Sequence, residues 1–411
     1  MKIFEKAKLE PVREEYISYV TKSGRCMEKE LTEMKEYIMG DDCVRDLERL
    51  KSGDYFLDYP RYRLVPKNFQ NKKRAVYSFT GTEGYLMKLV VYAMRGMEDI
   101  YSDRLFSFRH DKTGTDLLSE VSRDGNIWNK YVLKADISNY VGSIVPKLII
   151  PMLQEVFLPD DPDFFSFLKW LLTRNKVVDK DGNILDHCPG GMGGVPVGNF
   201  FMNLYLHEMD DYFAPRAAFY SRYSDDILIC ADTYEEIKEF EKHFYEILDR
   251  LRLVTNKEKT VILMPGEPFD LMGMELSGGC IRISVHAMNK IKRRIRKYAD
   301  RALINRNKGR MSPDEAAHDL IMRFNRYFFG GVRGGVHGGE SLTWAKWVFP
   351  IITDTECLKE IDNYIQESIR YVLYGSMKKR KYSIPYEKLT ELGYRTIVYY
   401  YHHQDMIQEI I

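Results

Sequence analysis

The spacing of hydrophobic positions changes several times along the chain, and each change predicts a switch between helices and strands. Residues 1 to about 55 carry apolar side chains at helical intervals, as in YISYV and MEKELTEMKEYIM. Residues 59–80, YPRYRLVPKNFQNKKRAVYSFT, break into short strand-like runs around a proline and a basic turn. TEGYLMKLVVYAMRGMEDIY then returns to helical spacing over residues 82–101, with Thr82 as a suitable N-cap.

Strands and helices alternate through the middle of the chain. YVLKADISNYV predicts a strand that ends at an aspartate, and VVDKDGNILDH predicts a hairpin that turns at Asp181 and Gly182. The helix NFFMNLYLHEMDDYF precedes a hairpin over residues 219–232, an amphipathic helix and the strand TVILM. From about residue 286 the pattern is helical, except at 330–339, where GGVRGGVHGG favours a flexible linker over a phosphate-binding loop. This order predicts an α+β fold with an antiparallel sheet packed on helices.

Charge is unevenly distributed, although the 411 residues carry a net charge of only +1. Ten Lys or Arg residues and one acid, Asp300, fall between residues 286 and 310, and KKRK follows at residues 378–381. Such clusters are typical of nucleic-acid contact, although a solvated helix face has the same composition.

Cysteine usage and hydropathy bear on the compartment. Six cysteines without a CxxC pair argue against a zinc site and a disulfide framework. The charged N-terminus lacks the apolar core of a signal peptide, and no apolar run approaches the roughly 18 residues that span a bilayer. We therefore expect a soluble cytoplasmic protein with no membrane partner.

Three aspartates are the candidate chemistry. Asp225 and Asp226 stand between two apolar runs in FYSRYSDDILICAD, and Asp136 ends the strand VLKAD. If these strands pair, three carboxylates meet at one edge of a sheet, where like charges require a cation. This set suits two Mg²⁺ ions, or Mn²⁺, of which one activates a 3′-hydroxyl and the other holds a triphosphate. A solvated turn is the alternative reading of an isolated pair of aspartates.

Several motifs around these aspartates occur in one order. RYSDDILI resembles the YxDD box of reverse transcriptases, and DISNYVGSI resembles the box before it. GGVPVGNFFMNLYLHEMDDY, NKEKT and FDLMGMEL are similar to the glycine-turn, lysine and primer-grip boxes, and PKNFQNKKRAV and LFSFRHDKTG resemble the fingers boxes. The resemblance covers residues 60–285 and implies a right-hand polymerase. It divides the chain into an N-terminal helical extension (1–55), fingers (56–134), palm (135–285) and a helical thumb-like domain (286–411).

The resemblance also implies roles for individual residues. Asp136, Asp225 and Asp226 would bind the metal ions together with the backbone carbonyl of Ile137, and Lys259 would be the general acid for pyrophosphate. Further residues would contact the triphosphate, the sugar, the template or the primer: Lys67, Lys73, Arg74, Tyr140, Val141, Gly194, Pro196, Gly198, Asn203 and Gly273. In the basic segment, four residues would hold the nucleic-acid backbone: Arg293, Arg294, Arg296 and Lys297.

Two departures from the family pattern affect this interpretation. Val141 stands where the family has an aromatic residue that excludes a 2′-hydroxyl, so the sugar gate is wider unless Tyr140 swings into the gap. The glycine-turn box is shorter than usual by roughly one helical turn, and Val197 replaces the commoner glutamine.

The size of the chain and the lack of a Cys/His cluster favour a compact bacterial enzyme of the defence-associated or abortive-infection (unknown-group) type, related to retron and group II intron reverse transcriptases. By analogy, the resemblance implies a structured noncoding RNA template, dNTPs, a cDNA product and anti-phage defence. A template-independent or protein-primed polymerase and a non-catalytic RNA-binding scaffold are the alternatives. The oligomeric state is left open.

Overall fold

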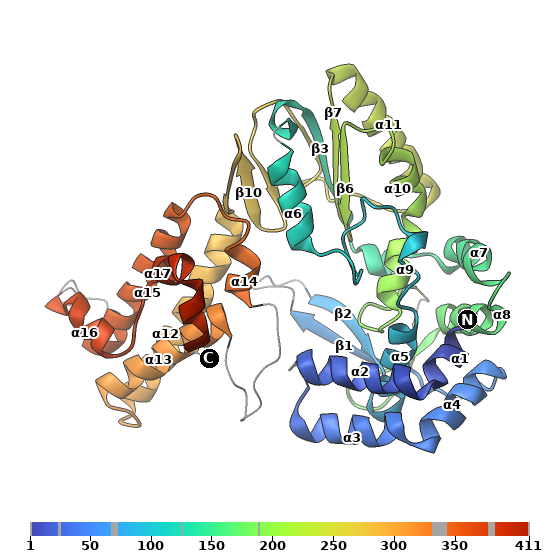
Figure 1. Ribbon diagram of the computed structural model, residues 1–411, viewed down its shortest axis with the longest axis horizontal. Helices are drawn as coiled ribbons and strands as arrows, with labels where there is room; N and C mark the ends of the chain where they lie inside the picture. The colour runs from blue at the N-terminus through green and yellow to red at the C-terminus, as the bar shows by residue number, and fades with distance from the viewer. Residues whose placement is uncertain are drawn as a thin grey trace. The chain divides into compact units, whose positions relative to one another are not determined.

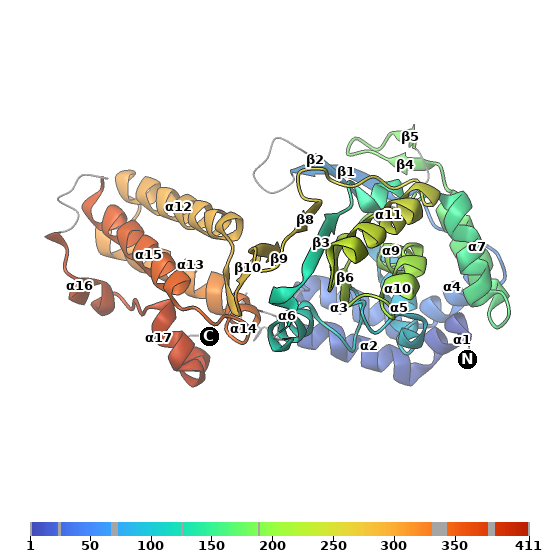
Figure 2. The ribbon, with the colours of Figure 1, turned by 90° about the horizontal axis from the view of Figure 1, so that it is seen from above.

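The computed structural model describes residues 2–23, 26–66, 73–124, 126–187, 190–330, 343–376 and 383–409. Lys67, the basic segment 378–381 and most of the predicted linker at 330–339 lie outside the described residues. The chain divides into two compact units. Figures 1 and 2 colour the chain from blue at the N-terminus to red at the C-terminus. The larger unit comprises Met1–Lys22, Cys26–Leu117 and Asn129–Pro265, and the smaller unit comprises Ser23–Arg25, Leu118–Trp128 and Gly266–Ile411. The predicted division into fingers, palm and thumb remains a prediction.

The N-terminal part of the larger unit is helical, as the spacing of its apolar residues predicts. Its helices are α1 (Ile3–Lys8), α2 (Glu10–Ser23), α3 (Glu28–Met39), α4 (Asp41–Lys51) and α5 (Gly81–Ala93). On α4, Cys43, Leu47 and Leu50 lie on one face at helical spacing, and all three are buried. Helix α1 packs on α4 and α5, and Phe4 meets Phe164 of α8 (Pro162–Thr173) edge to face with ring centroids 5.4 Å apart.

The predicted helix over 82–101 begins and ends elsewhere. Helix α5 ends at Ala93, before Gly96, which has a φ of 90° that a helix cannot continue through. Its N-cap is Thr80 rather than Thr82, and the Thr80 side chain makes no capping hydrogen bond. The prediction was therefore right in the type of element and wrong in its bounds.

A four-stranded antiparallel sheet occupies the centre of the larger unit. Its strands lie in the order β6 (Phe219–Tyr223), β7 (Asp226–Ala231), β3 (Tyr131–Asp136) and β8 (Val261–Leu263). Residues 227–231 of β7 are all buried, which explains their unbroken apolar run. Helix α11 (Tyr234–Arg250) packs on β7 and β3, beside α10 (His207–Phe213), as Figure 1 shows. This arrangement confirms the expected α+β fold.

A second sheet adds two hairpins in the order β2 (Lys73–Ser78), β1 (Arg61–Pro66), β4 (Lys176–Val178) and β5 (Ile184–Asp186). The β4–β5 hairpin confirms the predicted turn, since Gly182 has a φ of 89°. The predicted helix over 199–213 is instead two helices, α9 (Gly198–Tyr205) and α10, because the backbone leaves helical geometry at Leu206. Helices α6 (Gly114–Arg123) and α7 (Pro146–Phe157) precede and follow strand β3 in the sequence.

The smaller unit consists of a three-stranded sheet and several helices. The strands lie in the order β11 (Cys280–Ile283), β10 (Met274–Ser277) and β9 (Phe269–Leu271). The helices are α12 (Val285–Asn307), α13 (Pro313–Phe329), α14 (Trp344–Val348), α15 (Glu356–Tyr374), α16 (Tyr386–Glu391) and α17 (Ile397–His402). Helix α12 packs on α13 and α15 (Figure 2). Over the described ranges, no helix has the length and apolar character needed to cross a membrane.

Candidate active site

The three predicted aspartates lie at one edge of the central sheet. Strands β3 and β7 pair in a register that sets Asp136 directly opposite Asp226, and Asp225 is the adjacent turn residue. The amide of Ile137 donates to the carbonyl oxygen of Asp225 at 3.2 Å, which ties the end of β3 to this turn. Among the residues described, no three His, Cys, Asp or Glu side chains lie close enough together to hold a metal ion by themselves.

A tight turn carries Asp225. Ser224 and Asp225 form the two-residue connection between β6 and β7, and Ser224 has a φ of 61°. Positive φ matches the twist of a two-residue hairpin but is uncommon for residues other than glycine. The Ser224 amide donates to Oγ of Ser107 at 2.9 Å, which holds the turn from behind.

The carboxyl group of Asp226 is suited to a cation. Its Oδ1 atom is buried and accepts no hydrogen bond. Burial raises the pKa of this carboxyl group to about 6; Lys134 opposes the rise, and Asp136 and Asp225 add to it. An unpaired buried carboxylate oxygen beside two other carboxylates is a set of oxygen donors that fits Mg²⁺ or Mn²⁺.

Asp136 is contacted by the segment that follows residue 255. The Nζ atom of Lys259 lies 2.7 Å from Oδ1 of Asp136, and Nδ2 of Asn256 lies 3.4 Å from its Oδ2. The backbone amide of Asn256 donates to the backbone carbonyl oxygen of Asp136 at 2.7 Å, and the backbone amide of Lys259 donates to the backbone carbonyl oxygen of Asn256 at 2.9 Å. These bonds bring the predicted general acid to the carboxylates. Asn256 is a contact that sequence reasoning did not assign.

A cavity of about 680 Å³ adjoins the turn. Asp225 lines it, together with five other predicted site residues: Arg74, Tyr140, Val141, Gly194 and Gly198. Glycine is required at 194, where φ is 106° and a Cβ would lie 2.6 Å from the carbonyl oxygen of Tyr77. The glycine-rich turn therefore lies directly against strand β2, which carries Arg74.

Tyr140 and Val141 occupy different environments. The ring of Tyr140 is buried, and its hydroxyl donates to the carbonyl oxygen of Met202. This bond anchors the ring, so Tyr140 does not swing into the gap beside Val141. Val141 is half-buried in the cavity wall, within a short 3₁₀ turn over Tyr140–Ser143.

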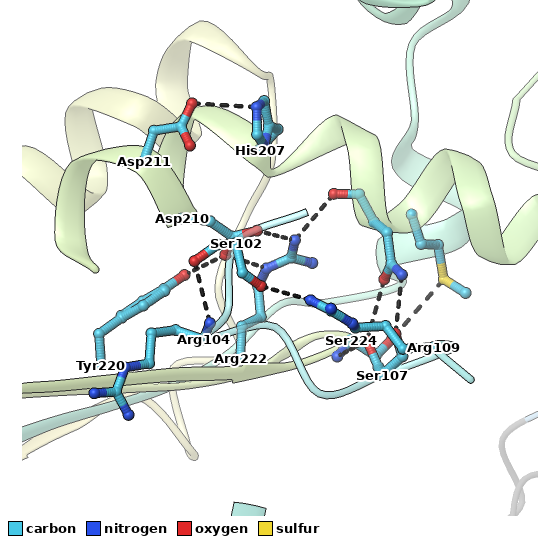
Figure 3. A network of polar contacts seen from close by, with 12 residues as sticks. Ser102, Arg104, Ser107, Arg109, His207, Asp210, Asp211, Tyr220, Arg222 and Ser224 are labelled. Atoms are coloured by element: carbon cyan, nitrogen blue, oxygen red, sulfur yellow. Dashed lines mark hydrogen bonds and ion pairs between the residues drawn. The ribbon is translucent and has the colours of Figure 1, made fainter. Parts of the chain in front are cut away.

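A buried ion pair lies beside the turn that carries Ser224, as Figure 3 shows. Nε of Arg222 donates to Oδ1 of Asp210 at 2.7 Å, and a second nitrogen contacts Oδ2. The same guanidinium donates to the carbonyl oxygen of Asn203 at 2.9 Å, and the Tyr220 hydroxyl donates to Asp210 Oδ1 at 2.7 Å. Burial disfavours the charge of Arg222, but Asp210 outweighs that effect and raises the pKa of the guanidinium. The guanidinium therefore stays charged, and its hydrogen bonds join β6 to α9 and α10.

Comparison with known proteins identifies the family. The sequence profile of reverse transcriptase (RNA-dependent DNA polymerase) matches residues 65–276, just over half of the chain. The chain belongs to the reverse transcriptase family. No curated protein matches the full sequence.

Solved telomerase structures are similar to this reverse transcriptase at low identity. Telomerase from Candida albicans, in complex with the TWJ fragment of telomeric RNA, is 12% identical over 86% of this chain and 66% of that chain, with a TM-score of 0.44. Apo telomerase from Candida tropicalis is 10% identical over 86% and 62%, with a TM-score of 0.47. Its form truncated from the C-terminal domain is 12% identical over 55% of each chain, with a TM-score of 0.42. The reverse transcriptase thus spans 55 to 66% of these telomerase chains.

Other predicted site residues of the reverse transcriptase lie away from the cavity lining. Lys73 is exposed at the start of β2, and Pro196 is half-buried in the glycine-rich turn. Asn203 is 1% exposed and bonds to Ser107, so it can shape the site only from behind. Gly273 has a φ of 85° and turns between β9 and β10 in the smaller unit.

The predicted backbone-binding residues lie on α12. Arg293, Arg294 and Lys297 are exposed, and Arg296 is half-buried. Arg294 lies over the ring of Tyr327 at 4.6 Å from its centroid, and Nε of Arg296 lies 3.0 Å from Oδ1 of Asp300. Part of this charge is therefore already engaged within the helical unit.

Proposed function

We propose that this reverse transcriptase is an RNA-directed DNA polymerase that adds dNTPs to the 3′ end of a primer. The observation that carries the proposal is the pairing of Asp136 with Asp226, beside Asp225, which lines a cavity together with Arg74. A carboxylate group next to a guanidinium suits a magnesium-bound triphosphate, since metal ions and fork-shaped donors both bind phosphate oxygens.

Asp136, Asp225, Asp226 and the carbonyl oxygen of Ile137 would hold the Mg²⁺ ions, with Mn²⁺ as a substitute. When bound, such ions lower the pKa of an attacking hydroxyl and neutralise charge on transferring phosphoryl groups. The unpaired Oδ1 of Asp226 supports this assignment because it leaves a donor unused by the protein. Asp226 would thus be a ligand that the fold keeps available.

Four further side chains would act on the triphosphate. Arg74 would bind its oxygens from β2, Lys73 would contribute positive charge from the same strand, and Lys67, outside the described residues, would add to it. Lys259 would donate a proton from Nζ to the departing pyrophosphate. The 2.7 Å contact with Asp136 supports this role because it places the ammonium group beside the carboxylates.

Nucleic acid would be gripped along its backbone by Arg293, Arg294, Arg296 and Lys297, with fingers, palm and thumb divided as the motifs indicate. We propose a bacterial defence-associated enzyme that works in the cytoplasm and copies a structured noncoding RNA into cDNA. This proposal rests on the motif resemblance.

A second candidate function follows from the short helix α9. Only eight residues, Gly198–Tyr205, separate the glycine-rich turn from Leu206, and Val197 replaces a glutamine that the family uses near the template. A polymerase that adds nucleotides without a template, or primes on protein, would need less of this surface. Such an enzyme would share the aspartates and differ in its template requirement.

The deciding experiment is incorporation of labelled dNTPs by the purified protein with an RNA template and primer, with primer alone, and with neither. Template-dependent extension supports the main proposal, and products that form equally well without template support the second. Sequencing nucleic acid that co-purifies with the protein adds an independent test. A cDNA complementary to one noncoding RNA supports RNA-directed synthesis, whereas homopolymeric or protein-linked DNA contradicts it.

A further inference from the structure

Phe108 combines two features that are individually costly. Its side chain is 42% exposed, and its backbone has a φ of 55°. The left-handed region is a true outlier for a bulky residue, and such strain persists only where the surrounding structure enforces it. An exposed aromatic ring in a strained backbone position therefore calls for a reason other than packing.

The residues beside Phe108 hold it in place. Ser107 is fully buried; its Oγ donates to Oδ1 of Asn203 at 3.1 Å, and its carbonyl oxygen accepts from Nδ2 of Asn203 at 2.9 Å. The same Oγ accepts from the Ser224 amide in the catalytic turn (Figure 3). On the other side, Arg109 donates to the carbonyl oxygen of Ser102 at 2.8 Å and pairs with Asp111.

The segment is also bonded to strand β6. The Phe106 amide donates to the carbonyl oxygen of Arg222, and the Arg222 amide donates to the carbonyl oxygen of Arg104, both at 2.9 Å. Because Arg222 is two residues from Ser224, the backbone before Phe108 and the catalytic turn form one hydrogen-bonded assembly. The backbone that precedes Phe108 is thereby tied to the turn that carries Asp225.

Phe108 lines the cavity that adjoins the turn, together with Arg74, Val141 and Asp225. The cation and the carboxylate suit a triphosphate, and an aromatic ring adds nothing to binding of phosphate. A ring face does suit a nucleobase, because every base has a π face on which it can stack.

We propose that Phe108 is a substrate-binding residue whose ring stacks on the base of the incoming nucleotide. The inference rests on the proposed polymerase function and deepens it, because it names a group that contacts the base. Ser107 and Asn203 are the positioning residues for the backbone that carries this ring.

Three substitutions separate stacking from folding. Phe108→Leu removes the π face and keeps the strained backbone, and it should raise the KM for dNTPs about five-fold to about a hundred-fold. Phe108→Tyr keeps an aromatic face and should restore most of the wild-type KM. Phe108→Gly should raise the melting temperature, because glycine adopts positive φ without strain, and should raise the KM at least as much as Leu.

A matched control tests strain alone. Arg252 also has a φ of 55°, is exposed and does not line the cavity. Arg252→Gly should therefore raise the melting temperature without changing the KM for dNTPs. A structural role for Phe108 would instead lower the melting temperature of Phe108→Gly and leave the KM unchanged.

The readouts are the steady-state KM for dNTPs on a primed RNA template, the Kd for that template, and the melting temperature. A higher KM in Phe108→Leu with an unchanged template Kd supports the inference. An unchanged KM, or a weaker template Kd with an unchanged KM, overturns it. Wild-type protein that incorporates no nucleotide contradicts the proposed polymerase itself, so the two failures are distinguishable.

Discussion

The ammonium group of Lys259 lies 2.7 Å from Oδ1 of Asp136, so a cation already faces one of the three aspartates at the edge of the central sheet. Lys259 is 56% exposed at this position, and its side chain can move away without disturbing the core. A divalent cation bound to Asp136 would compete with this contact. The lysine would then be released next to the phosphates, where a proton donor is needed.

The role of Lys259 as a proton donor can be tested with one variant that removes its positive charge and one that keeps it. Lys259→Ala should lower kcat about 10²- to 10⁴-fold, the usual range for a general acid. Lys259→Arg retains the positive charge but does not release a proton, so its kcat should also fall while the KM for dNTPs changes little. Lys257→Ala, which removes an exposed lysine two residues away, is the control. Wild-type kcat in Lys259→Arg would rule out proton donation.

Val141 should relax discrimination against ribonucleotides. A valine leaves more room for a 2′-hydroxyl than a phenyl ring does, and the hydrogen bond from Tyr140 to Met202 keeps the neighbouring ring away. We expect Val141→Phe to increase selectivity for dNTP over rNTP by about 1–2 kcal/mol, roughly five- to thirty-fold. Val141→Ile should give an intermediate value. The measurement compares kcat/KM for dNTP and rNTP, and equal selectivity in all three proteins would mean that Val141 is not the gate.

The Arg222–Asp210 pair should stabilise the site strongly. Replacing Asp210 by Asn leaves a buried guanidinium without its counter-charge, and about 3–5 kcal/mol of unfolding free energy should be lost. Glu208 lies two residues from Asp210 and makes an exposed contact with Arg250. Glu208→Gln breaks this contact and should lower the free energy of unfolding by about 1 kcal/mol or less. Chemical denaturation of the two variants makes the comparison. Equal losses of unfolding free energy would show that the buried pair stabilises the protein no more than the exposed pair does.

The basic face of α12 should bind nucleic-acid backbone. Neutralising Arg293, Arg294, Arg296 and Lys297 together should weaken binding to all sequences and reduce the salt dependence, because fewer counterions are released. Arg294 and Arg296 also contact Tyr327 and Asp300 within the helical unit. Binding titrations at several salt concentrations measure the slope. An unchanged slope would make the segment a solvated helix face.

The sequence alone predicted the parts of the site that follow from local pattern. Asp136 ends an apolar strand and Asp225 starts a turn, so strand periodicity was enough to expect that the carboxylates meet at a sheet edge. The α5 boundary was missed because a glycine with positive φ ended an otherwise helical pattern. The Asp226 protonation behaviour depends on burial, which the sequence does not reveal.

The supporting network could not be predicted in the same way. Arg222 stood as a charge inside an apolar strand, which was a signal that it needed a partner, but Asp210 was only one of several acids on the next helices. Ser107 and Phe108 gave no local signal, because their roles arise from bonds to Asn203 and Ser224, about a hundred residues away. Long-range hydrogen bonds of this kind require the fold.

The most direct test of the central claim is primer extension on an RNA template by the Asp225→Ala, Asp226→Ala double variant. We expect no extension with Mg²⁺ or Mn²⁺, together with a far-UV circular dichroism spectrum like that of the wild type. Asp232→Asn, which alters an exposed acid just beyond the end of β7, should extend the primer as the wild type does. Undiminished synthesis by the double variant would contradict the assignment of these aspartates as the metal-binding centre of a polymerase.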